Sequence, residues 1–323
     1  MVKKVVIVGL GNIGLKYDID RRKKFTLSHA NAFSKNKSFL LIAGIDTKKN
    51  LRNIFEKKYN VSSFNTLKEC SKSNSPDIVV ISNNTPKRLD TLKNIIKYWP
   101  SIKIVICEKP LAHNLIEAKK IRSLSKKNNI NMYINFFRRS CPGIKILKNK
   151  IKNNSLTFPF EGFAIYSRGL INNGSHLINI LHYLFGKVES IKVLSRYKSY
   201  MHNDYNYSFV LKFKNGSVNF FPSTIKKYYT NSIELKFSNG IIKLDNSLRD
   251  IKYHKIIDDK IFKSFKIMDN NYLELNTNYS LCQKYFVDEL LKKINNKSAS
   301  ISTIEDGFYT QVILNKIINN KKN

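Results

Sequence analysis

The stretch that decides the fold is Val5-Val6-Ile7-Val8-Gly9-Leu10-Gly11-Asn12-Ile13-Gly14, where a run of β-branched residues leads directly into the pattern G-x-G-x-x-G. Gly9 permits a tight turn, Gly11 lets the main chain approach a pyrophosphate, and Gly14 lets a following helix pack closely on the strand. Free N–H groups at the start of that helix would face the anion. The stretch therefore predicts a dinucleotide-binding unit, with a plain glycine turn in an α/β protein as the alternative.

The first 135 residues alternate between apolar strand-like runs and helical runs. Strands are expected at 4–9, 39–45, 77–81, 103–107 and 130–136, and helices near 28–36, 47–58, 65–72, 86–98 and 114–128. Strands separated by helices in this rhythm imply βαβ crossovers. A Rossmann-type, doubly wound parallel sheet is therefore predicted for a dinucleotide-binding domain at 1–136.

The rhythm changes after residue 137, which predicts a second domain at 137–323. A helix near 142–152, a strand near 158–167 and a helix near 174–185 precede a series of strands from 188 to 266. The turns Lys214-Asn215-Gly216 and Ser238-Asn239-Gly240 indicate antiparallel hairpins. Helices near 272–296 and 303–320 close the chain, the last able to pack back on the first domain. The prediction is an α+β domain for substrate binding and oligomerisation, with a large, mostly antiparallel open sheet.

The composition is that of a globular protein with an unusual charge. Among the 323 residues, 57 Lys+Arg against 23 Asp+Glu give a formal net charge of +34. The basic residues are spread along the whole chain without a dense block, so a nucleic-acid-binding protein is only a minor alternative. Such a field would still steer an anionic substrate.

The cysteines and the apolar runs bear on metal content and location. Cys70, Cys107, Cys141 and Cys282 form neither a C-x-x-C pair nor a zinc pattern, which predicts reduced thiols and no metal site. Lys3-Lys4 leads into a strand rather than a signal peptide, and no run approaches the roughly 20 apolar residues of a membrane span. A cytoplasmic protein without a membrane partner is expected.

Two polar groups stand where parallel strands are expected to end. Asp46 follows the second strand, where a carboxylate can accept hydrogen bonds from the adenosine ribose, although it could also cap a helix. It lies further from the glycines than usual, which a long first crossover with an insertion at Lys16–Lys24 would explain. Glu108-Lys109-Pro110 follows the strand expected at 103–107, where a lysine could bind a substrate hydroxyl or cofactor ribose, or help deprotonate an alcohol.

His176 lies where a polar, glycine-bearing loop enters a helix. A histidine on a first helical turn could exchange protons near neutral pH, although a lone histidine is more often a structural one. Asn172 and Asn179 lie one turn before and one turn after it, so the three side chains could share a helix face.

These features together resemble the glucose–fructose oxidoreductase/inositol dehydrogenase/MocA (Gfo/Idh/MocA) family of NAD(P)-dependent oxidoreductases over most of the chain. Further matches are Ser28-His29-Ala30, Thr85-Pro86, the Arg-Arg…Pro segment at Phe137–Pro142, and Gly174-Ser175-His176 with Asn179, which resembles the family's G-x-H-x-x-D. The resemblance implies that Lys109 and His176 act at the substrate carbon that exchanges hydride with the nicotinamide. In the family's pattern the positions of Asn172 and Asn179 are often Asp, and an amide can neither accept a proton nor hold a charge.

The resemblance also implies a sugar, cyclitol or nucleotide-sugar substrate, and homo-oligomers formed through the sheet of the second domain. NAD is favoured because Asp46 would repel a 2′-phosphate, although Lys48 and Lys49 leave NADP open. A non-catalytic NAD-binding protein of the same fold is the alternative that the two asparagines suggest. The predicted cofactor contacts are Gly9, Gly11, Asn12, Ile13, Gly14, Asp46, Ser82, Asn83, Thr85, Pro86, Glu108 and Lys109.

The substrate contacts rest on residue chemistry. An anionic group would suit arginines, a sugar ring could stack on tyrosine, and hydroxyl groups suit asparagines. Salt bridges for the arginines and core packing for the tyrosine are the alternatives. The predicted set is Arg138, Arg139, Tyr166, Arg168, Asn172, Asn173 and Asn179.

Overall fold

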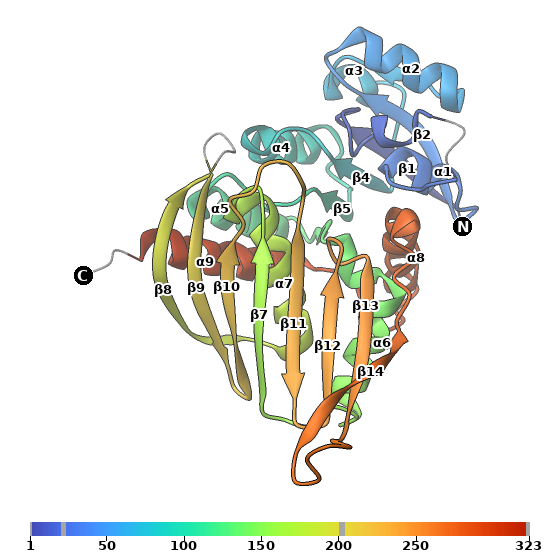
Figure 1. Ribbon diagram of the computed structural model, residues 1–323. Helices are drawn as coiled ribbons and strands as arrows, with labels where there is room; N and C mark the ends of the chain where they lie inside the picture. The colour runs from blue at the N-terminus through green and yellow to red at the C-terminus, as the bar shows by residue number, and fades with distance from the viewer. Residues whose placement is uncertain (1, 21–23, 200–203, 321–323) are drawn as a thin grey trace. The chain divides into compact units, whose positions relative to one another are not determined.

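The computed structural model describes residues 2–20, 24–199 and 204–320 (Figure 1). Its contacts divide the chain into two compact units, each formed by two segments. The first unit is Met1–Ser140 with Ser280–Gln311, and the second unit is Cys141–Tyr279 with Val312–Asn323. The boundary thus lies four residues beyond the expected one, and a segment near the C-terminus returns to the first unit.

The first unit contains a six-stranded sheet in the order β3-β2-β1-β4-β5-β6, with every neighbouring pair parallel. The strands are β1 (Lys3–Val8), β2 (Phe39–Ile45), β3 (Ser63–Phe64), β4 (Ile78–Ile81), β5 (Ile104–Cys107) and β6 (Asn131–Ile134). β4 is buried at all four positions, as strands covered on both faces are. The predicted doubly wound sheet is confirmed, and only the short edge strand β3 was not expected.

Helices cover both faces of this sheet. The helices are α1 (His29–Ser34), α2 (Lys49–Tyr59), α3 (Leu67–Ser71), α4 (Arg88–Tyr98), α5 (Leu115–Lys127) and α8 (Cys282–Ile294). One apolar core holds residues of α1, α2 and α8, and the other holds residues of α3, α4 and α5. Side-chain caps begin three of the helices, including the expected cap in which Asn114 Oδ1 accepts the Glu117 N–H at 2.9 Å.

The second unit contains an eight-stranded sheet in the order β14-β13-β12-β11-β7-β10-β9-β8 (Figure 1). Its strands are β7 (Phe160–Tyr166), β8 (Val188–Lys198), β9 (Tyr205–Phe213), β10 (Gly216–Pro222), β11 (Asn231–Phe237), β12 (Gly240–Asp245), β13 (Asp250–Asp258) and β14 (Lys266–Glu274). Only β7 and β10 pair in parallel, so the expected mostly antiparallel sheet is confirmed.

The second unit also contains the helices α6 (Pro142–Lys152) and α7 (Ser175–Phe185). The C-terminal part of α9 (Ile304–Asn319) belongs to this unit as well. Both expected hairpins have two-residue loops, because Phe213 pairs with Gly216 and Phe237 pairs with Gly240. Phe160 of β7 stacks on Phe185 of α7, with ring centroids 4.0 Å apart, so α7 packs on the face that Phe160 presents.

Two expectations about helices are wrong. Residues 272–281 do not open a long helix, because the chain to Glu274 pairs with β13 and α8 begins only at Cys282. The glycine turn also does not lead into a long helix. Leu15 N–H donates to Gly11 O at 2.9 Å in a single turn, a short 3₁₀ turn η1 (Lys16–Asp18) follows, and α1 begins at His29.

The buried carboxylate of Asp18 organises this unusual first crossover. It accepts hydrogen bonds from the Leu27 N–H at 2.8 Å and from the Ser28 N–H and hydroxyl at 2.7 Å each. Asp18 therefore joins the end of η1 to the start of α1. Residues 21–23 of the expected insertion lie outside the described residues.

All four cysteines lie within the described residues as buried, reduced thiols. Burial raises the pKa of Cys70 to about 12 and that of Cys107 to about 11. In the described ranges, no His, Cys, Asp and Glu side chains gather in threes that could hold a metal ion. No described helix is long and apolar enough to cross a membrane.

Candidate functional site

The three glycines after β1 have different surroundings. Gly9 has a φ of +99°, and a Cβ there would lie 2.6 Å from Asn83 N. A Cβ on Gly14 would lie 2.0 Å from Gly9 O, whereas a Cβ on Gly11 would meet nothing within 4 Å. Gly9 and Gly14 are thus required by the protein's own packing, and Gly11 borders open space.

A cavity of about 320 Å³ opens beside this loop within the first unit. Gly11 borders it, together with residues that follow β2 and β4, as expected for the carboxyl edge of a parallel sheet. Its lining comprises Val8, Gly9, Gly11, Ile45, Asp46, Thr47, Lys48, Leu51, Asn65, Thr66, Leu67, Ser82, Asn83, Asn84 and Lys87.

Asp46 ties the end of β2 to the glycine loop. Its Oδ2 accepts the Leu10 N–H at 2.7 Å, and its Oδ1 accepts the Lys48 N–H at 2.9 Å next to the start of α2. Asp46 does not cap α2, because the N-cap residue is Lys48 and the start of the helix has no side-chain cap hydrogen bond. An ionised carboxylate has about four acceptor positions, so hydrogen bonds from a ribose remain compatible with both contacts.

The residues after β4 brace the same loop. Ser82 Oγ donates to Gly9 O at 2.7 Å, and Asn83 Nδ2 donates to Thr91 Oγ1 at 2.7 Å. Thr85 and Pro86 form the 3₁₀ turn η2 (Thr85–Lys87) that leads into α4. The side chains of Ser82 and Asn83 therefore shape the cavity wall through protein contacts.

The remaining residues of the glycine loop contact the start of α1. Ile13 O accepts the His29 N–H at 2.9 Å and Gly14 O accepts the Ala30 N–H at 3.0 Å, while the Asn12 side chain is exposed. The short helix α1 thus supports the glycine loop from behind.

Glu108 lies at the end of β5 in a buried polar cluster. His29 Nε2 lies 2.7 Å from its Oε1, and Asn135 Nδ2 donates to the same oxygen. Burial acts to raise the pKa of the Glu108 carboxyl, but these two hydrogen bonds and the Arg88 charge outweigh it and hold that pKa below its usual range. The expected cofactor contact from this side chain is corrected, because Glu108 is 7% exposed and binds protein groups.

Lys109 follows Glu108 and is partly exposed. The buried guanidinium of Arg88 donates to the carbonyls of Glu108, Lys109 and Pro110. Sequence reasoning missed Arg88 and Asn135 and gave His29 no role, because each acts through a partner far away in the chain.

The two arginines of η3 (Phe137–Ser140) are buried. Arg139 Nη1 lies 3.1 Å from Asp306 Oδ2, so this side chain forms the salt bridge that was the alternative to substrate binding, which is a correction. The guanidinium of Arg138 lies 5.0 Å from the Phe137 ring centroid, and the residue is 4% exposed.

In the second unit, Tyr166 ends β7 as a core residue. It is fully buried, and its hydroxyl donates to Tyr207 O at 2.8 Å and accepts the Tyr207 N–H at 2.7 Å. The expected stacking on a substrate ring is wrong, because both ring faces lie in the core. Arg168 is exposed, with its guanidinium 5.8 Å from the Tyr229 ring centroid.

His176 is the second residue of α7 and is 4% exposed. A π-helical turn at Leu170–Gly174 precedes it, a local geometry that is frequent at functional sites. Asn173 is 5% exposed and its Nδ2 donates to Ser167 O at 2.7 Å, which corrects the expectation that this residue contacts the substrate. Asn172 is partly exposed and Asn179 is fully buried.

A carboxylate that sequence reasoning missed lies at the start of this turn. Asp204 accepts the Ile171 N–H at 3.0 Å and the Asn172 N–H at 3.1 Å. Burial raises the pKa of Asp204, although these hydrogen bonds oppose the rise. A Cβ on Gly169, whose φ is +91°, would lie 2.1 Å from Asp204 Oδ2, so glycine is required here. Asp204 thus anchors the main chain that leads to His176.

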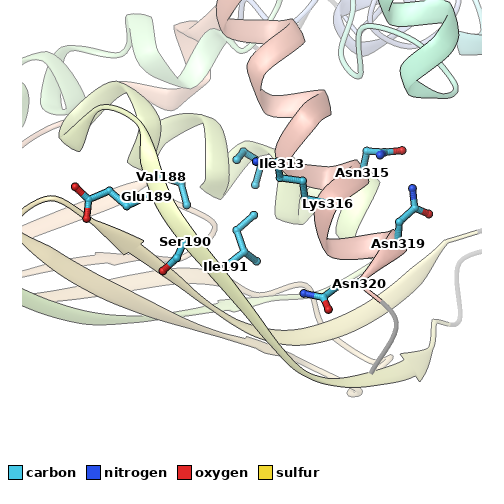
Figure 2. Close-up of a pocket in the computed structure, with 9 residues that line it drawn as sticks. All are labelled: Val188, Glu189, Ser190, Ile191, Ile313, Asn315, Lys316, Asn319 and Asn320. Carbon is cyan, nitrogen blue, oxygen red and sulfur yellow. The ribbon is translucent and has the colours of Figure 1, made fainter. Parts of the chain in front are cut away.

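The second unit has a cavity of about 420 Å³, and none of the predicted site residues lines it. Figure 2 shows its lining, which comes from the start of β8 and the C-terminal part of α9. Its residues are Val188, Glu189, Ser190, Ile191, Ile313, Asn315, Lys316, Asn319 and Asn320.

Both halves of the chain match models of one protein family. Residues 3–136 match the model described as an oxidoreductase family with an NAD-binding Rossmann fold. Residues 169–323 match the corresponding C-terminal α/β domain of that oxidoreductase family.

One curated relative is the glucose-6-phosphate 3-dehydrogenase of Bacillus subtilis (strain 168). It is 28% identical over 155 residues, which are 48% of this chain and 39% of that protein. The matched part is thus well under two thirds of the relative's length.

Solved structures share the fold over nearly the whole chain. One of them is the WlbA dehydrogenase from Bordetella pertussis in complex with NADH and UDP-GlcNAcA. Its TM-score is 0.75 at 13% sequence identity, and the match covers 98% of this chain and 94% of the WlbA chain. An oxidoreductase from Agrobacterium radiobacter, in complex with NAD⁺, L-tartaric acid and magnesium, has a TM-score of 0.75 at 12% identity, covering 99% and 98%.

Proposed function

Because this chain belongs to the Gfo/Idh/MocA family of NAD(P)-dependent oxidoreductases, we propose that it moves a hydride between a nicotinamide cofactor and a hydroxyl or keto carbon of a sugar, cyclitol or nucleotide-sugar. The observation that carries the proposal is the cavity bordered by Gly11 and Asp46 at the carboxyl edge of the parallel sheet. The nucleotide-sugar in the Bordetella pertussis structure supports the substrate class.

The residues around this cavity fit a dinucleotide. The N–H groups of Gly9 and Leu10 donate to Ile45 O and to Asp46, so the main-chain N–H groups of residues 11–14 would bind the pyrophosphate, and Gly11 leaves the space for its approach. Thr85 and Pro86 remain proposed cofactor contacts. Asp46 would accept hydrogen bonds from the ribose hydroxyls and repel a 2′-phosphate, which favours NAD. Lys48 in the lining offers a charge that a 2′-phosphate could use, so NADP is the outcome to compare.

The bound nicotinamide supplies the hydride acceptor or donor. For alcohol oxidation, an imidazole nitrogen of His176 would take the hydroxyl proton while the carbon loses its hydride, and for ketone reduction His176 would return that proton. The Lys109 ammonium would hold the same oxygen and stabilise its developing negative charge. Arg138, Arg168 and Asn172 remain the proposed substrate contacts, whereas Asn179 is fully buried, as Tyr166 is, and is no longer among them.

A non-catalytic NAD-binding protein is the second candidate, and one observation favours it. Asn172 and Asn179 stand where the family often has Asp, and an amide can neither accept a proton nor hold a charge. This candidate predicts saturable cofactor binding without turnover of any sugar or polyol.

We also propose that the second unit self-associates through its sheet. On the face opposite to Phe160, the side chains of Phe163, Ile165 and Ile241 are half-buried and Phe221 is 46% exposed. Apolar side chains gathered on one sheet face are typical of protein interfaces. Light scattering of the wild type and of Phe221→Arg should show an oligomer that the substitution weakens, and a wild-type monomer at micromolar concentration would contradict this.

The test of the proposed function is a turnover screen. Purified protein is mixed with NAD⁺ or NADP⁺ and a panel of sugars, sugar phosphates, cyclitols and nucleotide-sugars, and with the reduced cofactors and keto-sugars, while nicotinamide absorbance is recorded. Turnover of one substrate class with one cofactor supports the enzyme. Cofactor binding with no turnover across the panel would favour the non-catalytic candidate, and no binding of either cofactor would overturn both.

A further inference from the structure

Arg88 occupies a position that is unfavourable for a cation. It is the first residue of α4 and is 4% exposed. The N-terminus of a helix carries a partial positive charge, and a buried charge is costly unless it is hydrogen-bonded. The side chain must therefore make contacts that outweigh both effects.

Those contacts are three successive carbonyl groups after β5. Arg88 Nη1 donates to Glu108 O at 2.5 Å and also to Pro110 O, while Nη2 donates to Lys109 O at 3.3 Å. A guanidinium presents its N–H groups in one rigid plane and stays charged, so a single side chain can hold several acceptors in a fixed arrangement.

The same segment is held independently on its other side. Glu108 N–H donates to Ile81 O at 2.9 Å, and the Glu108 carboxylate binds His29 and Asn135. The main chain at Lys109 thus lies between the buried Glu108 cluster and the Arg88 guanidinium. With Arg88 removed, the carbonyls of Lys109 and Pro110 lose this guanidinium donor, while the Glu108 carboxylate stays bound to His29 and Asn135.

We propose that Arg88 is a positioning residue, which holds the main chain of residues 108–110 and thereby directs the Lys109 side chain toward the reacting oxygen. This inference rests on the proposed role of Lys109. A residue that only stabilised the start of α4 would affect turnover whether or not Lys109 is present. The effect of Arg88 on turnover should instead act through Lys109 alone.

The first arm of the experiment needs no substrate. Amide hydrogen exchange is measured by mass spectrometry on wild type, Arg88→Met, Arg88→Lys and the control Lys93→Met, which removes an exposed cation from the same helix. Arg88→Met should speed exchange at least tenfold in the peptide covering residues 108–116 and leave the β1 peptide unchanged. Arg88→Lys should fall between, because an ammonium cannot reach three carbonyls in one plane. Unchanged exchange in 108–116, or an equal increase in β1, would overturn the proposal.

The second arm is a double-mutant cycle on turnover. Arg88→Met should lower kcat about 100-fold in the wild-type background, because small misplacements of a catalytic group have effects of that size, and Lys93→Met should not lower it. In the Lys109→Met background, Arg88→Met should change kcat less than twofold, since the group it directs is already absent. An equal loss in both backgrounds would overturn the proposal. A wild type that turns over nothing would count against the proposed function instead, and the exchange arm would still decide whether Arg88 holds the segment.

Discussion

The two units use their polar residues at strand ends in different ways. In the first unit, Asp46 and Ser82 come from two different strand ends, and both hydrogen-bond to the main chain of the glycine loop beside a cavity. In the second unit, Tyr166 ends β7 and Asn173 follows the same strand, and both bind main-chain groups of their own unit. Parallel strand ends converge, so polar residues there meet at one edge. Polar residues at the end of a single strand in a mostly antiparallel sheet are not brought together at one edge in this way. They can therefore have a local structural role as readily as they can bind a ligand.

The largest expected effect comes from removing a side chain that is proposed to act on the reacting oxygen. Lys109→Met and His176→Ala should each lower kcat about 10²–10⁴-fold, because each removes a group that acts on the reacting oxygen. His182→Ala on the same helix is the control, since His182 Nδ1 is paired with Gly186 O at 3.0 Å and has no proposed catalytic role. Steady-state rates by nicotinamide absorbance measure this, and full activity in both variants would remove the mechanistic assignment.

The glycine loop offers a matched pair of substitutions. Gly14→Ala should lower the free energy of unfolding by about 1–3 kcal/mol, because its Cβ would lie 2.0 Å from Gly9 O and the loop must shift. Gly11→Ala should leave the unfolding of the cofactor-free protein unchanged, because its Cβ meets nothing within 4 Å. It should instead weaken cofactor binding, as its Cβ would occupy the space proposed for the pyrophosphate.

Thermal melts with and without NAD⁺ separate these two effects. Equal loss of stability in both glycine variants would show that Gly11 has a packing role and would weaken the contrast between them.

Glu108→Gln tests the buried cluster through its pH dependence. The pKa of Glu108 is lowered in the folded protein, so its ionised form contributes stability above the unfolded pKa of about 4.3, and that contribution is lost as the pH falls through the folded pKa. The variant should be about 1–3 kcal/mol less stable at pH 7, with a deficit that shrinks in acid.

Chemical denaturation at a series of pH values measures this deficit, with Glu161→Gln, an exposed position on β7, as the control. A deficit that stays constant down to acid pH would mean that the charge of Glu108 does not contribute.

Tyr166→Phe carries the smallest expected effect and bears directly on the second unit. Losing the two hydroxyl hydrogen bonds to Tyr207 should lower the free energy of unfolding by about 1 kcal/mol. The KM for substrate should not change, because the ring is fully buried. A raised KM with unchanged stability would restore Tyr166 to the substrate contacts.

Most of the fold was predictable from local signals, and the exceptions have physical causes. The buried strands, the Asn114 cap and the two hairpin turns each carry a short-range pattern that decides the local structure. The single turn after Gly14 depends on Asp18 binding Leu27 and Ser28, and the strand to Glu274 depends on pairing with β13. Such contacts between separated segments have no local signature.

The site was predictable where the motif itself makes the contact. Gly9, Gly14 and Asp46 lie where the pattern predicts, because main-chain geometry and strand order fix them. The roles of Arg88 and Asp204 were not predictable, since each is defined by carbonyl or N–H groups of a distant segment. The feature that marks Arg88 is a cation buried at the start of a helix. Its burial is known from the structure and not from the sequence.

The proposed function requires that the cavity bordered by the glycine loop and Asp46 binds a nicotinamide dinucleotide. Isothermal titration of the wild type with NAD⁺, NADH, NADP⁺ and NADPH at about 0.15 M salt, where surface charge is screened, tests it most directly. We predict saturable binding of one stoichiometric equivalent of NAD(H), weaker binding of NADP(H), and loss of NAD(H) affinity in Gly11→Ala. Absence of saturable binding of any of the four cofactors, or equal affinity in Gly11→Ala, would contradict the claim.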